Sequence, residues 1–555
     1  MAQSEVREEA PAIEDTKSLA PRTPEAPARS GRHGGRGGGR RAGGPKTDQR
    51  RRRRRVLRWS ATLLAVVILG TAGAGYLYYQ HLNSNIQKGT RANGDDSKAH
   101  RTRPNAAGQT PLNILLIGSD SRNSKENLKL GGSRDHVGDP PLGDVQMLIH
   151  LSADRKSAAM VSIPRDTRVN IPRCTDPKSG HVYPATNDII NVSLARGGAG
   201  CTLLTWENLT GVYIDHWMTI DFAGVVRMAD AIGGVEVCVN QNVWDHSTPS
   251  QRGGSGLKLT RGSHEVKGEK ALQWLRTRHA WGSDLMRARA QHMYLNSMVR
   301  TLKQQNVFTD TGRLMDLAEA ATKSLKVSEE IGTVKKLYDL GMEMKSVPTD
   351  RITSLTMPNI PDPNDPDNHV VPDDGKAAQL WQMLQDDVPL DKNGGKPGAT
   401  KDAGKDKDTP AKKPSLDASR LGVLVQNATR TGTEAAVQQR ASAIGQVLVQ
   451  KGYARAQADV SGSLAEDKTV VRYPSADLEG DAQAVAKALG IPMSSVKKST
   501  DVSGVTVVVG ADWRSGSSYP KQSAPKAGDL PEGTDAVNAS DKGDCMDVYK
   551  PYQWS

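Results

Sequence analysis

Two short apolar runs in this chain lead directly into charged side chains. Residues 112–117 are followed by Asp120 and Arg122, and residues 158–163 are followed by Arg165 and an aspartate. Each run is bounded by turn residues, which predicts a strand in the core of a sheet. Because ligand-binding groups collect at strand ends in α/β sheets, we expect these side chains near a bound ligand. The alternative is two surface ion pairs that follow ordinary strands.

The rest of the apolar pattern alternates between strand-like and helix-like periods, which predicts an α/β fold with helices on both faces of a sheet. A further strand is expected at 145–151. Helical patterns occur at 202–210, 221–231, 267–275, 285–303 and 314–324. Near the C-terminus, a second and smaller α/β domain is expected, with strands at 421–426, 468–473 and 504–509 and helices at 433–451 and 480–489.

A stripe of polar side chains is expected on a helix that begins near residue 283. Asp284, Arg287 and Gln291 are spaced i, i+3 and i+7, which places them on one face. Just before this helix, Arg276 and Arg278 are two residues apart, so they share a side only where the chain is extended. Such a stripe is usually a solvated face. Its occurrence beside the two charged strand ends makes it a candidate part of the same site.

The net charge of +12 is concentrated near the N-terminus. Residues 1–58 carry 16 Lys and Arg against 7 Asp and Glu, mostly in a Gly/Pro-rich segment of disordered composition. The apolar stretch 56–79 is long enough to span a bilayer. The positive-inside rule then places the N-terminus in the cytoplasm and the main domains outside. This distribution argues against nucleic-acid binding, and a cleaved signal peptide is the weaker alternative because tyrosines close the apolar run.

The four cysteines all lie beyond the apolar stretch, where disulfides are permitted. Four cysteines allow three connectivities. Cys174 and Cys201 bracket one loop-rich insertion, so we favour this pair, and Cys238 is then left for Cys545. The cysteine and histidine positions show no spacing typical of a zinc site.

Several segments of the chain resemble the LytR-CpsA-Psr family of bacterial envelope proteins, in the family order and over about 110–350. They are NILLIGSDSR at 113–122, GDVQMLIHLSADRKSAAMVSIPRDTRVNIP at 143–172, LTGVYIDHWMTIDFAG at 209–224, AIGGVEV at 231–237, KGEKALQWLRTRH at 267–279 and SDLMRARAQ at 283–291. Near the C-terminus, the chain is similar to the small domain often attached to this family, of the actinobacterial type, in VLVQNATRTG at 423–432, VVRYPS at 470–475 and GVTVVVGADW at 504–513.

The resemblance implies a mixed central sheet in the main domain. Together with pattern and composition, it divides the chain into seven expected parts. These are a disordered basic cytoplasmic tail (1–55), a transmembrane signal-anchor helix (56–79), an extracytoplasmic stalk (80–110), the LytR-CpsA-Psr catalytic domain (111–388), a linker (389–419), the C-terminal domain (420–515) and a mobile tail (516–555).

The resemblance also implies an activity at the cytoplasmic membrane: transfer of a glycopolymer from a polyprenyl-pyrophosphate carrier to peptidoglycan, with formation of a phosphodiester. Asp120 and Asp144 match the family carboxylates that hold Mg²⁺ or Mn²⁺, hard cations that prefer oxygen ligands. Guanidinium groups suit pyrophosphate oxygens, and the matching pyrophosphate-binding positions are Arg165, Arg276, Arg278, Arg287 and Gln291, with Arg122 nearby. Arg165 and Asp284 are the expected catalytic residues, and Asp284 either orders Arg287 or acts as a base.

Two positions depart from the family pattern. Leu142 and Ala290 stand where many relatives have arginine. Arg289 is adjacent to Ala290, but one residue on a helix turns a side chain by about 100°, so Arg289 is not a simple substitute. Two other functions stay open: a hydrolase that cleaves polyprenyl pyrophosphate with water, and a non-enzymatic envelope scaffold or regulator. A transcriptional role would need the folded part in the cytoplasm, which the charge distribution disfavours.

Overall fold

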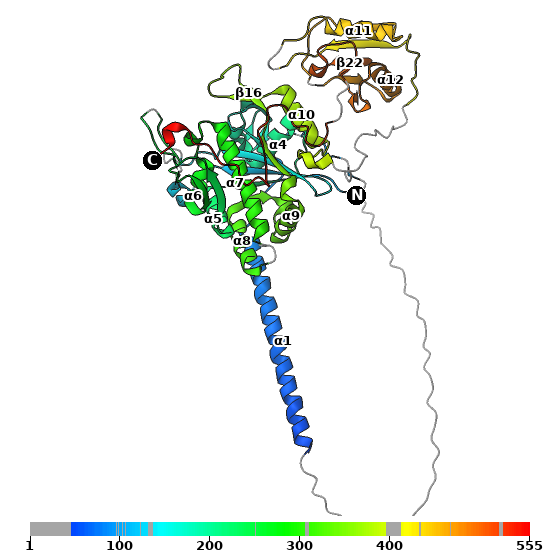
Figure 1. Cartoon of the computed structure of the whole chain (residues 1–555). Helices are drawn as coiled ribbons and strands as arrows, with labels where there is room; N and C mark the ends of the chain where they lie inside the picture. Colours follow the sequence, from blue (N-terminus) through cyan, green and yellow to red (C-terminus); the bar gives the residue numbers. More distant parts are fainter. Residues whose placement is uncertain are drawn as a thin grey trace, which may run out of the picture. The chain divides into compact units, whose positions relative to one another are not determined.

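The computed structural model describes most of the chain after residue 45 (Figure 1). The described ranges are 46–95, 97, 99–102, 104–105, 107–121, 124–130, 137–249, 251–305, 310–395, 412–431, 435–466, 468–520 and 525–555. Most of the tail expected at 1–55 therefore lies outside the described residues. The chain divides into two compact units, Met1–Ala74 and Gly75–Ser555.

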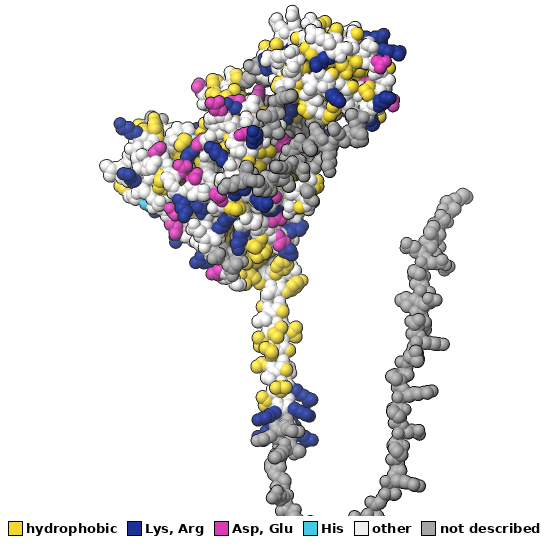
Figure 2. Space-filling model, turned by 45° about the vertical axis from the view of Figure 1, so that its right-hand side comes forward, with side chains coloured by type: hydrophobic (Ala, Val, Ile, Leu, Met, Phe, Trp, Pro, Cys, Tyr) yellow, Lys and Arg dark blue, Asp and Glu magenta, His cyan; other side chains and the backbone are white. Residues whose placement is uncertain are grey.

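The N-terminal helix is longer than the apolar stretch at 56–79. Helix α1 runs Lys46–Asn85, and its part Arg51–Asn85 is long and apolar enough to cross a membrane by length and composition. Figure 2 shows apolar side chains along this helix and a cluster of Lys and Arg side chains near its start. The structure thus contains the candidate membrane helix that the sequence predicts.

The segment expected as a stalk at 80–110 packs on the main domain over much of its described length. Asn83 Oδ1 accepts a hydrogen bond from the backbone N–H of Val334, 3.0 Å away. Leu82 is buried, and strand β1 (Gln87–Gly89) joins the edge of the main sheet. The apolar side chains of this segment leave water by packing, which explains the difference from a free stalk.

The central sheet has eight strands among the described residues, with mixed directions as predicted. Their order across the sheet is β1, β14 (Leu325–Ser328), β9 (His216–Ile220), β2 (Leu112–Ser119), β3 (Gly143–Leu151), β4 (Ala158–Ile163), β15 (Ile352–Thr356) and β23 (Ala536–Asn538). β3 runs antiparallel to both β2 and β4, and β9 runs parallel to β2. The C-terminal ends of β2, β4 and β9 and the N-terminal end of β3 therefore lie along the same side of the sheet, where these strands end or begin.

Helices and small hairpins surround this sheet. The helices are α2 (Lys125–Lys129), α3 (Ser193–Gly197), α4 (Ala199–Thr210), α5 (Phe222–Ile232), α6 (Gly268–Arg276), α7 (Asp284–Gln304), α8 (Thr311–Ser324), α9 (Val334–Ser346) and α10 (Asp374–Gln385). The two-stranded pairs are β5 (Arg168–Ile171) with β8 (Thr186–Ile189), β6 (Cys174–Thr175) with β7 (Val182–Tyr183), β10 (Val235–Val239) with β13 (Gly262–Val266), β11 (Val243–Trp244) with β12 (Lys258–Leu259), and β16 (Asn359–Pro361) with β17 (Val370–Pro372).

Two apolar cores hold the helices against opposite faces of the sheet, which confirms the predicted α/β architecture. One core packs Leu115 of β2 against Trp206 of α4 and Trp381 of α10. The other packs Met160 of β4 against Leu295 of α7. Successive side chains of a strand point to opposite faces. All six residues of β4 are buried and five of them are apolar, as expected of a central strand that is covered on both faces.

The C-terminal domain has its own five-stranded sheet, in the order β19-β18-β22-β20-β21. Its elements are β18 (Gly422–Asn427), α11 (Arg440–Gln450), β19 (Arg455–Ala458), β20 (Val470–Tyr473), α12 (Glu479–Leu489), β21 (Val496–Lys498) and β22 (Val505–Val509). The helix expected at 433–451 starts only at Arg440, because Gln439 adopts a left-handed backbone (φ 56°) that a continuing helix excludes.

The tail expected to be mobile at 516–555 instead packs on the main domain through residues 525–555. Strand β23 pairs antiparallel with β15 and completes the sheet edge. Val537, Met546 and Tyr552 are buried, so the sparse apolar residues of this polar segment hold it in place.

Both favoured disulfides form. Cys174 is bonded to Cys201, with Cα atoms 5.7 Å apart. Cys238 at β10 is bonded to Cys545, with Cα atoms 4.6 Å apart, and this bond ties the tail to the main domain.

Candidate functional site

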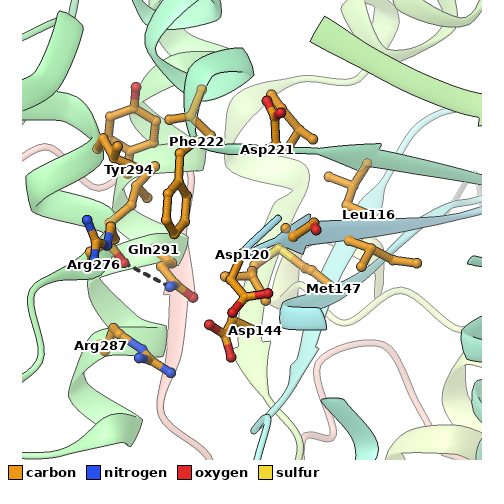
Figure 3. A pocket seen from close by; sticks show the side chains of 18 of the residues that line it. Leu116, Asp120, Asp144, Met147, Asp221, Phe222, Arg276, Arg287, Gln291 and Tyr294 are labelled. Atoms are coloured by element: carbon orange, nitrogen blue, oxygen red, sulfur yellow. Dashed lines mark hydrogen bonds between the residues drawn. The ribbon is translucent and has the colours of Figure 1, made fainter. Parts of the chain in front are cut away.

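A cavity of about 600 Å³ opens at the sheet edge where β2, β4 and β9 end. Its walls come from these strand ends, the start of β3, and helices α5, α6 and α7 (Figure 3). The charged and amide residues predicted from sequence that line it are Asp120, Asp144, Arg165, Arg276, Arg278, Arg287 and Gln291. Three distant segments of the chain therefore meet in one place, as the strand-end argument expects.

Two carboxylates face this cavity where β2 and β3 pair (Figure 3). Asp120 is 5% exposed, and its Oδ1 accepts a hydrogen bond from the backbone N–H of Leu142 at 2.8 Å. Asp144 is the second residue of β3 and is partly exposed. Proteins often bind Mg²⁺ through one or two carboxylates, and substrate phosphates and water supply the other ligands. The donor set of Asp120 and Asp144 fits such a cation.

The described residues contain no group of three or more His, Cys, Asp or Glu side chains arranged to hold a metal ion.

Arg165 joins the strand carboxylates to the arginine cluster. Its Nη1 lies 3.1 Å from Asp144 Oδ1, and its Nε lies 3.3 Å from Asp166 Oδ2. Burial lowers the pKa of Arg165. The charges of Asp144, Asp166 and Asp284 raise it by more than burial lowers it, so the pKa is higher than usual. The guanidinium stays charged and anchored at the cavity, and its side chain is still 24% exposed.

Arg276 and Arg278 reach the same cavity because the helix stops between them. α6 ends at Arg276, and Thr277 has a non-helical, extended backbone (φ −59°, ψ 124°). Residues two apart share a side in an extended chain, so Arg276 and Arg278 both line the cavity. Arg276 donates a hydrogen bond to Leu130 O at 2.8 Å and lies over the Phe222 ring at 4.7 Å. Burial lowers the pKa of Arg276, and a nearby aspartate partly offsets this.

Arg287 and Gln291 of the α7 stripe form the remaining polar wall, whereas Asp284, which the resemblance implied to be catalytic, is not among the residues that line the cavity. Asp284 Oδ1 lies 2.9 Å from Arg287 Nη2 and 3.7 Å from Arg278 Nε. Burial lowers the pKa of Arg287, and Asp284 partly compensates. Gln291 Nε2 donates to Leu275 O at 3.0 Å, the dashed line in Figure 3. The ion pairs of Asp284 with Arg278 and Arg287 are those of a residue that orders arginines, as in the role of ordering Arg287 that the sequence left open beside that of a base.

The two departures from the family pattern have structural roles. The backbone of Leu142 both donates to and accepts from Asp120. Ala290 is fully buried, and its carbonyl accepts a hydrogen bond from Trp274 Nε1 at 3.1 Å. Arg289 forms ion pairs with Asp544, at 2.8 Å, and Asp535 in the C-terminal tail. It therefore does not replace an arginine at 290, as expected. Arg122 lies outside the described residues.

A large part of the cavity wall is apolar, and the sequence analysis did not locate it. Figure 3 shows Leu116, Met147, Phe222 and Tyr294 on this wall. Burial raises the pKa of the Tyr294 hydroxyl, so it stays protonated. Leu116 and Met147 lie on strand positions facing away from the α4 core, and this alternation was visible in the sequence. In a strand buried on both faces, however, such positions cannot be told from core.

A third stretch of the wall carries Asp245, Ser255 and His279, which sequence reasoning did not single out. They come from the β11–β12 hairpin and from the short 3₁₀ turn His279–Trp281 after α6. We call these three residues the polar wall.

The site is defined by an α/β domain that places a carboxylate pair and four arginines beside an apolar cavity, features that suit an anion with an apolar tail. The model of the LytR_cpsA_psr family matches residues 76–386, more than half of the chain, and the protein belongs to this family. A second model, described as LytR cell envelope-related transcriptional attenuator, matches residues 420–513. The resemblance noted from the sequence is thereby confirmed.

Among curated relatives, the Corynebacterium glutamicum cell wall biosynthesis protein LcpA is 29% identical over 330 residues, which cover 55% of this chain and 60% of LcpA. The probable cell wall biosynthesis protein LcpB of the same organism is 29% identical over 242 residues, 42% of this chain and 53% of LcpB. The chain thus spans 60% or less of these two relatives. The Bacillus subtilis polyisoprenyl-teichoic acid–peptidoglycan teichoic acid transferase TagT is 26% identical over 295 residues, 53% of this chain and 84% of TagT.

Solved structures in the same family are also similar. The crystal structure of B. subtilis TagT shares 21% identity, with a TM-score of 0.36, and covers 54% of this chain and 99% of that chain. The LytR-Csp2A-Psr enzyme from Actinomyces oris shares 18% identity, with a TM-score of 0.37, and covers 54% and 97%.

Proposed function

We propose that the protein is a phosphotransferase that moves a glycopolymer from a polyprenyl-pyrophosphate carrier to peptidoglycan, with formation of a phosphodiester. The observation that carries this proposal is the placement of Arg165, Arg276, Arg278 and Arg287 around one cavity that is otherwise largely apolar. Arginine forks match pyrophosphate oxygens, and an apolar cavity matches an isoprenoid chain. The relative TagT, named a teichoic acid transferase that acts on peptidoglycan, supports the same reaction class.

The reaction exchanges one phosphorus–oxygen bond for another. A hydroxyl oxygen of the acceptor bonds to the phosphorus that carries the polymer, and the bond from this phosphorus to the bridging oxygen breaks. Polyprenyl phosphate leaves, and the hydroxyl proton passes to solvent. Phosphoryl transfer depends mainly on positioning and charge neutralisation. Arg165 and Arg287 stabilise the charge that develops on the phosphate oxygens, and Asp284 holds Arg278 and Arg287 in position.

Asp120 and Asp144 would hold Mg²⁺ or Mn²⁺ beside the pyrophosphate. The cation would neutralise charge on the phosphate oxygens that the arginines do not reach. The backbone hydrogen bond from Leu142 fixes Asp120 for this role, while Arg165 fixes Asp144.

The apolar wall would receive the first isoprene units of the carrier. Leu116, Met147, Met218, Phe222 and Met298 line it. Unbranched methionine side chains adapt to irregular apolar ligands, which suits a flexible isoprenoid chain.

The proposed site faces the outside of the cytoplasmic membrane, with α1 as a single-pass anchor. The Arg cluster Arg51–Arg55 stands at the start of the apolar helix, and positive residues favour the cytoplasmic side. Two disulfides in the folded unit suit an oxidising compartment. A reporter that is active only outside the cytoplasm, fused after Ser555, should be active. Activity of a cytoplasm-only reporter at that position would reverse the topology.

A reconstituted transfer assay tests the function. The full chain in lipid vesicles is mixed with a polyprenyl-pyrophosphate-linked glycan, Mg²⁺ and peptidoglycan. We expect covalent attachment of glycan to peptidoglycan and release of one polyprenyl phosphate for each attachment. Release of carrier and glycan phosphate without attachment would establish the hydrolase instead. Binding of the carrier with neither outcome would leave a scaffold.

A further inference from the structure

The polar wall contains a buried carboxylate with one oxygen in use and one oxygen unused. Asp245 is 1% exposed and lines the cavity. Its Oδ2 accepts a hydrogen bond from the backbone N–H of Ser255 at 2.7 Å. Its Oδ1 is buried and has no hydrogen-bond partner among the residues that the structure describes. Buried polar groups are nearly always paired in folded proteins, so an unpaired one in a cavity wall points to a ligand.

A second unpaired polar atom lies on the same wall. His279 lines the cavity, and its Nδ1 is buried without a hydrogen-bond partner within the described part of the chain. The turn that carries it is tied to the β11–β12 hairpin, because Ser255 Oγ and Thr277 Oγ1 are 2.6 Å apart. A carboxylate only accepts hydrogen bonds, whereas an imidazole nitrogen donates or accepts according to its tautomer. A ligand hydroxyl both donates and accepts, so it is a chemically suitable partner for either atom.

The C-terminal tail supports this wall from the outside. The Tyr552 ring stacks on the His279 ring, with centroids 6.1 Å apart, and its hydroxyl donates to Gln251 Oε1 at 3.0 Å. Tyr549 is bonded through its backbone N–H to Ala280 O at 2.8 Å. Its own ring is 56% exposed. Tyr549 is thus an exposed tyrosine bonded to the turn that carries His279. A tyrosine offers an apolar face with a polar tip, and a sugar ring likewise combines an apolar face with hydroxyl groups.

We propose that Asp245, Ser255 and His279 form a carbohydrate subsite of the cavity, that Tyr549 is its stacking platform, and that Tyr552 is a positioning residue for His279. This inference rests on the proposed function, because it assigns the sugar that takes part in that reaction. The sugar belongs either to the acceptor glycan strand or to the glycan already attached to the donor pyrophosphate. Both present the same hydroxyl chemistry to the polar wall.

Asp245→Asn is the most direct test, since the amide keeps the size of the side chain and one oxygen for Ser255. It replaces the unused oxygen with an N–H₂ donor, which opposes an incoming hydroxyl donor. Asp339→Asn is the matched control, because Asp339 is a half-exposed carboxylate on α9, paired with Lys335. The full chain in detergent is titrated with three probes: soluble peptidoglycan glycan strands, farnesyl pyrophosphate without sugar, and the same pyrophosphate carrying a sugar.

We expect Asp245→Asn to weaken at least tenfold the affinity for one of the two sugar-bearing probes. Affinity for farnesyl pyrophosphate should stay within twofold of wild type, and Asp339→Asn should leave all three affinities unchanged. Loss toward glycan strands identifies the acceptor as the occupant, and loss toward the sugar-bearing pyrophosphate identifies the donor. Wild-type affinity of folded Asp245→Asn for both sugar-bearing probes overturns the subsite. A wild-type protein that ignores farnesyl pyrophosphate would count against the proposed function, while the glycan-strand titration still decides the subsite.

Tyr549→Ala gives a second reading that does not depend on a buried substitution. Its exposed ring contributes little to stability, so the variant should fold. We expect a loss of affinity of about fivefold for the same sugar-bearing probe, with recovery in Tyr549→Phe, which keeps the ring. Equal affinity of Tyr549→Ala and wild type removes the stacking platform from the proposal.

Discussion

The charged end and the apolar end of the cavity are built in opposite ways, although strands β2 and β3 and helix α7 contribute to both. At the charged end, arginines and carboxylates are held by specific contacts, such as those of Arg165 with Asp144 and of Arg287 with Asp284. At the apolar end, the lining includes unbranched side chains such as those of Met218 and Met298, which adopt several conformations. The charged end is therefore suited to one ligand geometry, whereas the apolar end tolerates variation in ligand shape. In the proposed reaction, the first end determines the chemistry and the second end holds the carrier.

Removal of the Arg165 side chain should have the largest effect on turnover, and it should impair the charged end without affecting the apolar end. We expect Arg165→Ala to lower turnover in the transfer assay by about 10²- to 10³-fold, the usual cost of a lost transition-state contact. The midpoint of thermal unfolding should change little, because the remaining arginines then repel one another less. A variant with wild-type turnover would show that the cluster is a set of ion pairs, each worth only about 0–1 kcal/mol.

Substitution of Asp144 should sharpen the assignment within the charged end. We expect Asp144→Asn to lose the dependence of turnover on Mg²⁺ concentration and to fall at least about tenfold to a hundredfold in activity, since even a residue that only supports a metal ligand commonly contributes this much. A Mg²⁺ titration of both proteins measures this. Asp166→Asn is the matched control, since Asp166 also pairs with Arg165 but is not among the cavity residues. An unchanged Mg²⁺ response in Asp144→Asn would contradict the cation site.

Substitution of two neighbouring leucines on β2 should distinguish the apolar end of the cavity from the core of the domain. Leu116→Ala should weaken binding of a long polyprenyl pyrophosphate about tenfold, since each buried CH₂ contributes about 0.8 kcal/mol. Binding of a short-chain pyrophosphate should change less, and stability should fall only slightly. Leu115→Ala, on the opposite face and fully buried, should cost about 2–5 kcal/mol of unfolding free energy without changing chain-length preference. Calorimetry with two chain lengths and urea unfolding measure these differences.

A buried histidine outside the cavity should affect stability and leave the two ends unchanged. His292 on α7 is fully buried, and burial lowers its pKa from 6.5 to about 4. The unfolded chain therefore binds a proton between these values while the folded chain does not. Unfolding free energy should fall by about 1.4 kcal/mol for each pH unit from 6.5 down to about 4, and no further below. Urea unfolding across this range measures the effect, and His292→Gln should flatten the slope. An equal slope in both proteins would assign it to other groups.

The sequence predicted the charged end well because strong chemistry lies at element boundaries. Asp120, Arg165 and two residues of the α7 stripe, Arg287 and Gln291, each follow or occupy a clear periodic segment, and the structure brings them to one cavity. The apolar end was not predicted because Leu116 differs from Leu115 only in the face it occupies, and both faces of the strand are covered. The polar wall was missed for another reason. His279 and the hairpin that carries Asp245 are brought together by tertiary contacts that leave no periodic signal.

Fold prediction failed mainly where pairing is distant in sequence. Strand β15 joins β4, nearly two hundred residues earlier, and its five residues alone give a weak pattern. Strand β23 has three residues in a Gly/Asp-rich segment and forms only because β15 offers an open edge. Short strands of this kind depend on their partners rather than on their own sequence.

The path of the chain has a consequence for how the protein is made. The chain leaves the main domain, forms the C-terminal domain, and returns to place β23 on the main sheet and Cys545 on Cys238. In topological terms, the second domain is inserted into the first rather than appended to it. The first domain can therefore finish folding only after residues 536–545, which supply β23 and Cys545, have been synthesised and exported. A nick in the connecting segment would leave both pieces covalently joined, whereas a stop codon after residue 515 would release an unfinished sheet with an open edge, a template for aggregation.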